Sequence, residues 1–408
     1  MDALSANQLS TNSDFPCPDL MSRAERELSA FFKAVTQLFG KEQAEISADD
    51  WLQELIEADG LPASTRELKW ITAKVTTRLA SRVGASSSPS ALLTELQIAY
   101  EEKNMRIFLT GATGFIGSAI VPELMNAGHQ VLGLARSDAG AKQLAAAGAQ
   151  VHRGDIEDLD SLRTGAAASD GVIHTAFVHD FSRFQEVCEI DRRAIEALGS
   201  ALAGSNRPLI VTSGTGVVLT PGRPSSEEDA PNSPMPRVSE QTGVSLAAKG
   251  VRVSVMRLPQ VHDPVKQGLI TYLINVAREK GVSAYVGDGL NRWPAVHRLD
   301  AARLYKLAFE KAAEKEDKGA RYNAVAEEGV PLREIAQAIG RGLKIPVVSK
   351  SPEQAAEHFG WLAAFVGHDL PASSALTQQW LAWRPTGPGL ISDLNAMNYF
   401  EAAMALHG

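Results

Sequence analysis

The sequence predicts an α/β fold in which helices cover both faces of a doubly wound parallel sheet. From residue 105 onward, short apolar segments typical of buried strands alternate with amphipathic helical segments. The candidate strands are 105–110, 130–135, 149–152, 171–176, 207–213 and 251–257. The chain has 408 residues, 44% of them hydrophobic, and no apolar run long enough to cross a bilayer. A globular protein of two or three domains is therefore expected.

The region before residue 105 predicts a separate all-α extension. Residues 1–18 are expected to be a disordered tail, and in 19–104 apolar residues recur at the spacing of a helical module. The stretch ASSSPS at 85–90 indicates a linker within it. Acidic residues outnumber basic ones in this region, the wrong sign for a phosphate backbone, so nucleic acid is not an expected partner. A docking or oligomerisation role and a passive cap on the core are equally compatible with this pattern.

The cellular context is also indicated by the sequence. The first residues, MDALSANQLSTNSDF, lack the basic and apolar regions of a secretory signal, which favours the cytoplasm. Cys17 and Cys188 are too few and too far apart for a disulfide framework or a cysteine metal site. We therefore expect no metal and no membrane association.

The segment MRIFLTGATGFIGSAIV at 105–121 predicts a dinucleotide-binding turn. Gly111, Gly114 and Gly117 stand between a strand and a helix, where their spacing permits a tight turn and a close approach to a pyrophosphate. The N–H groups at the start of the following helix attract phosphate. The other cofactor contacts expected in this turn are Thr113, Phe115 and Ile116.

From this motif onward the chain resembles the extended and atypical short-chain dehydrogenases/reductases, which include nucleotide-sugar epimerases and dehydratases. The resemblance covers about 105–400 and rests on several motifs in the family's order. These are TGATGFIG at 110–117, GDIEDLDSL at 154–162, VIHTAF at 172–177, IVTSGTGV at 210–217, VSVMRLPQVHD at 253–263 and ASSALTQQWLAWRPTGPGLISDL at 372–393. It implies a Rossmann-type fold over 105–408, interleaved with a small C-terminal substrate lobe at about 264–408.

The resemblance also implies where the cofactor is contacted. Asp155 and Ile156 lie in the loop expected beside the adenine. The remaining contacts follow the fourth, fifth and sixth strands, and they are Thr175, Ala176, Phe177, Thr212, Pro259 and Val261.

Arg136 and Ser137 follow the second strand, where an NAD enzyme would normally place an acid for the ribose 2′-hydroxyl. A guanidinium and a hydroxyl suit a 2′-phosphate, which they can bind through charge-assisted hydrogen bonds. The sequence thus favours NADP(H), with NAD(H) as the alternative if Arg136 only pairs with Asp138 or stacks on the adenine.

The superfamily's usual acid–base pair, a tyrosine followed four residues later by a lysine, is missing. The expected tyrosine and lysine fall near Asn232 and Pro236, in a segment typical of a loop. Ser213 resembles the family's catalytic serine, and a hydroxyl there can hydrogen-bond a substrate carbonyl. By itself, however, it cannot supply a proton near neutral pH.

Histidines are the candidates for a replacement acid, because their pKa is close to physiological pH. His179 follows the fourth strand, and His262 stands in the loop that the resemblance places beside the nicotinamide. Each could equally be a solvated loop residue. His174, inside the fourth strand, is expected to be a buried packing residue, and Glu240 to lie on the solvent-facing side of a helix.

The substrate end is expected to use Thr215 together with a polar and aromatic set at 291–293. Trp293 would give a stacking face, and Arg292, next to Asn291, would clamp a carboxylate or phosphate. Alternatively, Arg292 pairs with Asp288. His297 and Asp300 are expected to cap the next helix.

The sequence thus predicts an NADP(H)-dependent oxidoreductase that acts on a small carbonyl, hydroxyl or sugar-like substrate. Two alternatives remain open. One is an epimerase or dehydratase-like isomerase or lyase, and the other is a non-catalytic NADP(H)-binding sensor. The expected partner is a small molecule, and homo-oligomerisation also stays open.

Overall fold

The computed structural model describes residues 104–314 and 320–396, and the chain divides into two units, Met1–Asn104 and Met105–Gly408. The tail and the helical module expected for 1–18 and 19–104 lie outside the described residues. All elements described below belong to the second unit.

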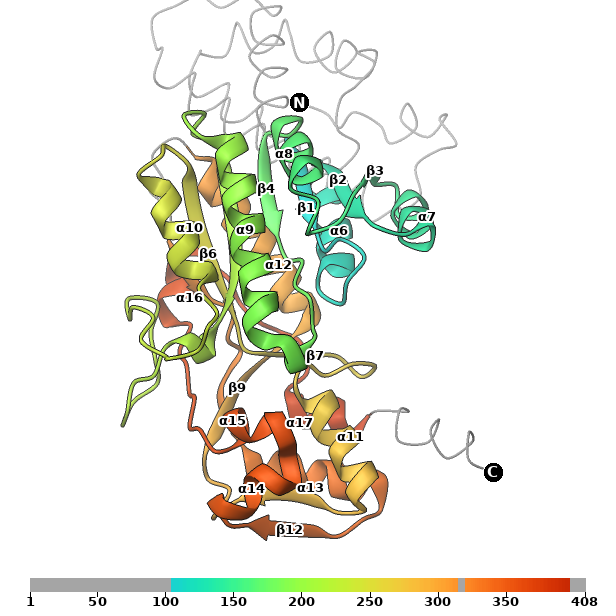
Figure 1. Cartoon of the computed structure of the whole chain (residues 1–408), viewed down its shortest axis with the longest axis vertical. Helices are drawn as coiled ribbons and strands as arrows, with labels where there is room; N and C mark the ends of the chain where they lie inside the picture. Colours follow the sequence, from blue (N-terminus) through green and yellow to red (C-terminus); the bar gives the residue numbers. More distant parts are fainter. Residues whose placement is uncertain (1–103, 315–319, 397–408) are drawn as a thin grey trace, which may run out of the picture. The chain divides into compact units, whose positions relative to one another are not determined.

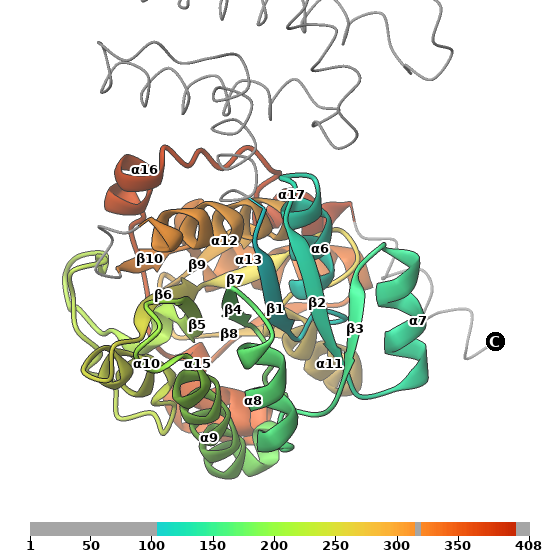
Figure 2. The same ribbon diagram turned by 90° about the horizontal axis from the view of Figure 1, so that it is seen from above.

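The central sheet (Figure 1) has seven parallel strands in the order β10-β6-β5-β4-β1-β2-β3, which can be followed by their labels in Figure 2. They are β1 Arg106–Thr110, β2 Gln130–Ala135, β3 Gln150–Arg153, β4 Gly171–His174, β5 Pro208–Gly214, β6 Arg252–Leu258 and β10 Arg321–Asn323. The first six agree with the predicted strands to within about two residues, which confirms the α/β fold class. The three-residue strand β10 was not predicted, because so short a segment has no distinctive pattern.

Helices cover both faces of this sheet (Figure 2). Alternation along β1 sends Ile107 and Leu109 to one core and Phe108 to the other. The first core is completed by α6 Gly117–Met125, α7 Asp138–Ala146 and α12 Arg298–Ala313. The second core is completed by α8 Leu159–Ala167, α9 Phe184–Leu202 and α10 Ser239–Ala247.

A smaller lobe contains a three-stranded sheet, β11-β9-β7, and a two-stranded sheet, β12-β8. The strands are β7 Gln260–His262, β8 Ser283–Val286, β9 Arg292–His297, β11 Glu327–Pro331 and β12 Val347–Lys350. The helices are α11 Ile270–Lys280, α13 Leu332–Leu343, α14 Pro352–Phe359, α15 Ala363–Val366 and α17 Leu390–Asn395. This lobe has its own hydrophobic core, which includes Trp293.

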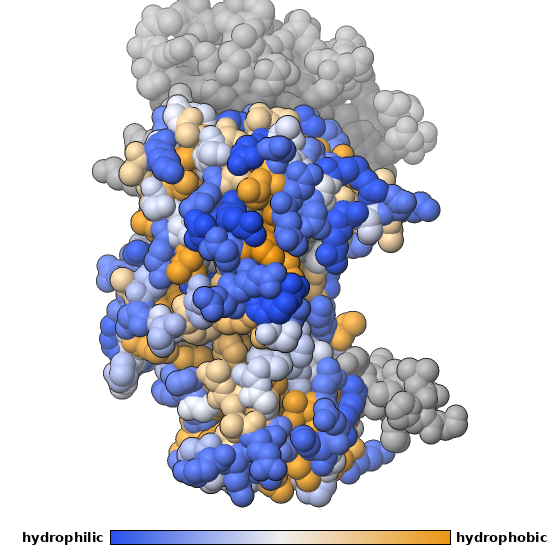
Figure 3. Space-filling view, in the orientation of Figure 1, coloured by the Kyte–Doolittle hydropathy of each residue, from blue (hydrophilic) through white to orange (hydrophobic). Residues whose placement is uncertain are grey.

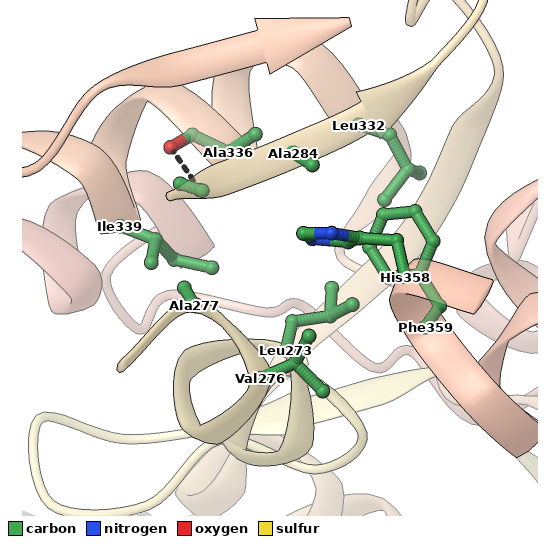
Figure 4. Close-up of a pocket in the computed structure, with 10 residues that line it drawn as sticks. Leu273, Val276, Ala277, Ala284, Leu332, Ala336, Ile339, His358 and Phe359 are labelled. Atoms are coloured by element: carbon green, nitrogen blue, oxygen red, sulfur yellow. Dashed lines mark hydrogen bonds between the residues drawn. The ribbon is translucent and has the colours of Figure 1, made fainter. Parts of the chain in front are cut away.

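The core of the C-terminal lobe contains a cavity of about 10 Å³ between α11, β8, α13 and α14 (Figure 4). The imidazole of His358 points into it among apolar side chains such as Leu273 and Phe359. The Nε2 atom of His358 is buried and has no hydrogen-bond partner among the described residues. The space is about that of one water molecule.

The two parts of the unit are interleaved along the chain. After entering the lobe, the chain returns to the central sheet as α12 and β10, and then goes back to the lobe. α16 Ala375–Leu381 packs near β10. Phe181, in the short helix η1 Phe181–Arg183, stacks on Trp361 of the lobe with the ring centroids 4.4 Å apart. Aromatic contacts therefore link the loop after β4 to the C-terminal lobe.

The visible surface mixes hydrophilic residues with smaller hydrophobic patches (Figure 3). Among the described residues, no helix combines the length and the apolar character needed to span a membrane.

Candidate cofactor and substrate site

The strand order reverses at β1, whose neighbours in the sheet are β2 and β4. In open α/β sheets, ligands bind at the carboxyl ends of the strands at such a switch point. The glycine-rich turn follows β1 at this edge, and the loop after β4 lies against it. Thr175 donates from its hydroxyl to the Thr110 carbonyl at 2.8 Å, and Ala176 N donates to Thr110 Oγ1 at 3.3 Å.

The turn leaves no room for side chains at two of its glycines. Gly111 has a φ of +68°, and a Cβ there would lie 2.7 Å from the nitrogen of Ala176. A Cβ on Gly117 would lie 2.0 Å from the carbonyl oxygen of Gly111. Gly114 closes the turn by donating its N–H to that same oxygen at 2.9 Å. This tight cradle before the N-terminus of α6 fits a dinucleotide pyrophosphate.

The residues that would face the cofactor at this turn keep accessible surface. Gly114 is exposed, whereas Thr113, Phe115 and Ile116 are half-buried. The structure therefore leaves the predicted contacts free to meet a ligand.

A network of buried, hydrogen-bonded polar side chains begins just before the glycine-rich turn. His174 Nδ1 lies 2.8 Å from Thr110 Oγ1, and its Nε2 lies 3.1 Å from an oxygen of Asp191 on α9. The other oxygen of Asp191 accepts a hydrogen bond from Ser239 at 2.5 Å. His174 is buried, as predicted, but it is hydrogen-bonded on both sides rather than simply packed. This hydrogen-bond network thus connects β1, β4, α9 and α10.

At the adenosine end, Arg136 is exposed at the end of β2 and makes no ion pair among the described residues. The alternative pairing with Asp138 is not found, because Asp138 pairs with Arg153 of β3. Ser137 caps α7 by accepting a hydrogen bond from Gly140 N at 3.1 Å. Arg136 is therefore free to meet a phosphate group.

The loop predicted to meet the adenine follows β3. Asp155 accepts a hydrogen bond from the backbone N–H of Glu157 at 3.0 Å, which shapes the loop. Ile156 packs into the core of the sheet.

The residues after β5 and β6 are less accessible than the sequence suggested. Thr212 uses its hydroxyl in bonds of 2.6 Å with the His174 carbonyl and with Tyr305 of α12. Ser213 and Thr215 are buried, and Ser213 Oγ has no hydrogen-bond partner among the described residues. Side chains alternate along β5, so Ser213 points to the face opposite Thr212. Of the two predicted residues near β7, Pro259 is half-buried and Val261 is buried.

His179 lies in the loop after β4, between the rings of Phe177 and Phe181, with centroids 5.6 and 6.2 Å away. Part of the imidazole is exposed. Its pKa is lowered from the ordinary value of 6.5 by desolvation, and further by the positive charges of Arg237 and Lys266. The neutral imidazole is consequently favoured at neutral pH.

His262 occupies a different environment from the one expected of a catalytic residue. Its ring is fully buried, and Nδ1 lies 2.7 Å from Asp393 on α17. Desolvation lowers the pKa of His262, with Asp393 acting in the opposite direction. Among the described residues, no hydrogen bond joins any two of Ser213, His179 and His262. The structure gives His262 a role in tying β7 to α17.

The set predicted for the substrate also serves to hold the C-terminal lobe together. Trp293 is buried in the lobe core, so the expected stacking face is not available. Arg292 binds both oxygens of Asp369, at 3.0 and 2.8 Å, instead of Asp288. The side-chain amide of Asn291 donates to the carbonyls of Val366 and His368.

One of the two predicted caps of the following helix is confirmed. His297 caps α12 by accepting a hydrogen bond from Leu299 N at 3.3 Å. Asp300 lies inside the helix instead, where its carboxylate accepts bonds from the backbone of Thr386 and Gly387. That prediction failed because these backbone partners are more than eighty residues away in sequence.

The segment that replaces the tyrosine and lysine is a closed loop followed by α10. Asn232 exchanges two hydrogen bonds with the backbone of Leu219, at 2.7 and 2.8 Å. Glu240, predicted to face solvent, is instead buried and binds Arg257 through two bonds of 2.8 and 2.7 Å. That prediction was wrong, because the partner arginine comes from β6 and helix periodicity alone could not reveal it.

Arg237 is the functional candidate that sequence reasoning missed. Its guanidinium lies 4.5 Å from the ring centre of Phe177 and donates to the Thr212 carbonyl at 3.1 Å. The available signal was its position, directly after Pro236, where the lysine was expected.

The doubly wound sheet and its glycine cradle define a dinucleotide-binding protein of the Rossmann type. The family model described as NAD dependent epimerase/dehydratase family matches residues 107–324. The chain belongs to this family.

Similar proteins agree with this assignment. An uncharacterised protein of Schizosaccharomyces pombe is 54% identical over 299 residues, which cover 72% of this chain and 100% of the relative. A 2-alkyl-3-oxoalkanoate reductase of Stenotrophomonas maltophilia is 28% identical over 261 residues, covering 60% of this chain and 78% of the reductase. The structure of a UDP-glucose 4-epimerase from Thermus thermophilus in complex with NAD matches with a TM-score of 0.57 and 20% identity. The matched region covers 73% of this chain and 100% of the epimerase, which shows that the two proteins share a fold.

Proposed function

We propose that this protein is an NADP(H)-dependent oxidoreductase that transfers hydride between the cofactor and a small carbonyl or hydroxyl compound. The observation that carries the proposal is the cradle formed by Gly111 and Gly117 at the switch point of the sheet. When bound, the nicotinamide cofactor would supply or accept the hydride. Membership of the family and the likeness to a 3-oxo acid reductase support this chemistry. The epimerase likeness keeps a sugar-like substrate as an alternative.

The preference for NADP(H) rests on Arg136, which is exposed at the end of β2 without an acidic partner among the described residues. Arg136→Asp should weaken NADPH binding by tenfold or more and leave NADH binding unchanged or stronger. A hydrogen bond to a charged group is worth roughly 1.5–3 kcal/mol, which is sufficient for such a change. Titration calorimetry with both cofactors measures it. The matched control is Lys249→Asp, since Lys249 is exposed just before β6, at the opposite edge of the sheet. Equal affinities for both cofactors, unaltered by Arg136→Asp, would show that the preference is absent.

The chain's own residues have separate parts in the proposed reduction. The turn and α6 would hold the pyrophosphate, and Phe177 with the loop after β4 would contact the nicotinamide end of the cofactor. Ser213, at the end of β5, orients the substrate carbonyl once neighbouring groups have moved, because its hydroxyl is buried without a partner. His179, directly or through water, supplies the proton to the carbonyl oxygen.

A screen of aldehydes, ketones and nucleotide sugars with NADPH tests this assignment. On any substrate found, Ser213→Ala should reduce kcat while NADPH affinity is retained, since the lost interaction matters mainly in the transition state. If Ser213→Ala and His179→Ala both keep full turnover, the assigned residues are wrong.

A non-catalytic NADP(H) sensor is the second candidate. The observation in its favour is Asn232, which stands near the position of the usual tyrosine and is hydrogen-bonded to Leu219. The sensor proposal predicts tight NADPH binding that changes the association state of the protein without turnover of any compound in the screen. Light scattering with and without NADPH distinguishes it from the enzyme.

A further inference from the structure

Arg237 carries a charge that no carboxylate meets directly. Its hydrogen bonds go to neutral partners, the Ser239 hydroxyl and the Thr212 carbonyl, each at 3.1 Å. Asp191 is near, but its two oxygens are occupied by His174 and Ser239. Nη1 of Arg237 has no hydrogen-bond partner among the described residues. A half-buried guanidinium in this state has donors available for a ligand.

Lys266 brings a second cation toward the same place from the turn after β7. It is exposed, and its ammonium lies 5.7 Å from the ring centre of Phe115 in the glycine-rich turn. The acid of its own turn, Asp263, is paired with Arg298 at 2.9 Å. Among the described residues, Lys266 therefore forms no ion pair.

His179 lies beside Arg237, because its ring centre is 5.6 Å from that of Phe177, over which the Arg237 guanidinium lies. Arg237 and Lys266 both act on its imidazole, and both disfavour its protonated form. The acid next to His179, Asp180, is held by Arg183 at 2.9 Å and by Ser182. The three side chains thus come from the loop after β4, the segment before α10 and the turn after β7, and among the described residues neither cation is hydrogen-bonded to a carboxylate.

We propose that the substrate carries an anionic group, a carboxylate or phosphate, that binds the Arg237 guanidinium beside His179, with the charge of Lys266 adding to the attraction. This inference rests on the proposed function and narrows its substrate class to small acidic carbonyl or hydroxyl compounds, of which oxo acids are the simplest. The planar guanidinium can bind a carboxylate through two parallel N–H donors while keeping its bonds to Thr212 and Ser239.

The same positive charge could instead serve the pyrophosphate of the cofactor, which is also an anion. The two sources differ in place for Arg237, which lies over Phe177 in the loop after β4, whereas the pyrophosphate belongs at the glycine-rich turn. Lys266, over Phe115 of that turn, is near the place of the pyrophosphate and does not separate the two sources. Substitution of Arg237 should therefore affect the substrate and leave NADPH binding nearly unchanged.

The experiment compares an acid with its methyl ester on the protein saturated with NADPH. The probes are acetoacetate with methyl acetoacetate, and 4-formylbenzoate with methyl 4-formylbenzoate. Binding is measured by calorimetry with a non-reducing cofactor analogue, and turnover by NADPH absorbance. In the wild type, at least one acid should bind about tenfold more tightly than its ester, a difference of about 1.4 kcal/mol.

Variants of Arg237 and Lys266 test whether the difference in affinity between the acid and its ester comes from these two cations. Arg237→Gln should abolish the preference for the acid, Arg237→Lys should retain part of it, and Lys266→Gln should reduce it about threefold. Lys249→Gln, an equal loss of charge at the amino end of β6 and thus away from the carboxyl ends of the strands, should leave it intact. Circular dichroism and the midpoint of urea unfolding establish that each variant is folded, and NADPH affinity is measured separately. Because Lys266 is exposed, its variant remains informative even if Arg237→Gln unfolds.

The outcomes separate this inference from the proposed function. Equal binding or turnover of acids and esters by an active wild-type protein overturns the anionic substrate and leaves the oxidoreductase standing. Loss of NADPH binding in Arg237→Gln, with the acid preference unchanged, assigns the anion to the cofactor and also overturns it. Failure of the wild type to bind either nicotinamide cofactor contradicts the proposed function itself.

Discussion

The central sheet and the C-terminal lobe hold their functional segments in different ways. Around the glycine-rich turn, backbone atoms approach so closely that the position of Gly117 admits no Cβ. In the lobe, segments far apart in sequence are tied by side chains that bind backbone or carboxylate groups, as Asn291 and Arg292 do for 366–369. The comparison teaches that the shape of the glycine-rich turn depends on residues without a side chain, whereas the lobe depends on hydrogen bonds made by side chains.

The largest expected effect is that of Gly117→Ala. The new Cβ would lie 2.0 Å from the Gly111 carbonyl, so the turn and the start of α6 must move apart. We expect NADPH binding to be lost and the midpoint of urea unfolding to fall. The matched control is Gly367→Ala in the lobe, where a Cβ would meet nothing within 4 Å. Normal NADPH affinity in Gly117→Ala would contradict the close-packing account of the turn.

The buried ion pair beside the sheet should have the next largest effect. Glu240 and Arg257 are each about 1% exposed, and Arg321 also binds Glu240 at 2.6 Å. Glu240→Ala leaves Arg257 charged in the core, so unfolding free energy should drop by about 3–5 kcal/mol. Glu186→Ala, which breaks an exposed pair with Arg183, should leave the free energy of unfolding nearly unchanged. Urea denaturation measures both, and similar losses in the two variants would argue against the buried pair.

A smaller, pH-dependent effect is expected in the lobe. Burial lowers the pKa of His358 below 6.5, with help from the charges of Lys350 and Lys280. The unfolded chain therefore takes up a proton more readily, and the free energy of unfolding should decrease as the pH falls below about 6.5. His358→Leu should remove this part of the decrease. Urea midpoints of both proteins at pH 7.5 and 5.5 provide the measurement, and an unchanged slope in the variant would disprove it.

The subtlest prediction concerns the pH profile of any reductase activity. A proton donor must be protonated, so reduction should slow as the pH rises through the pKa of His179, which lies below 6.5. The kcat/KM profile of the wild type should show this limb, and His179→Gln should lack it. A limb that survives the substitution would place the proton donor elsewhere.

The sequence predicted the part of the fold whose signals are local. Strand β1 and the glycines after it are contiguous, so their pattern identified both the parallel sheet and the tight turn that follows β1. Arg257 and Glu240, or Asp300 and Thr386, are distant in sequence, and no periodicity indicates that they pair. The prediction for Trp293 failed because an aromatic residue in a loop-like pattern gives no sign of whether its side chain faces a ligand or a hydrophobic core. Arg237 acquires its meaning only when the ends of β4 and β5 are brought beside α10.

The position of β10 at one edge of the sheet has a consequence for biosynthesis. A ribosome completes β6 well before it reaches Arg321–Asn323, so the nascent sheet ends for a time in an unpaired parallel edge. Such edges are templates for pairing with other chains. Newly made molecules should therefore be most prone to aggregation, and most dependent on chaperones, during the interval in which the lobe is being translated.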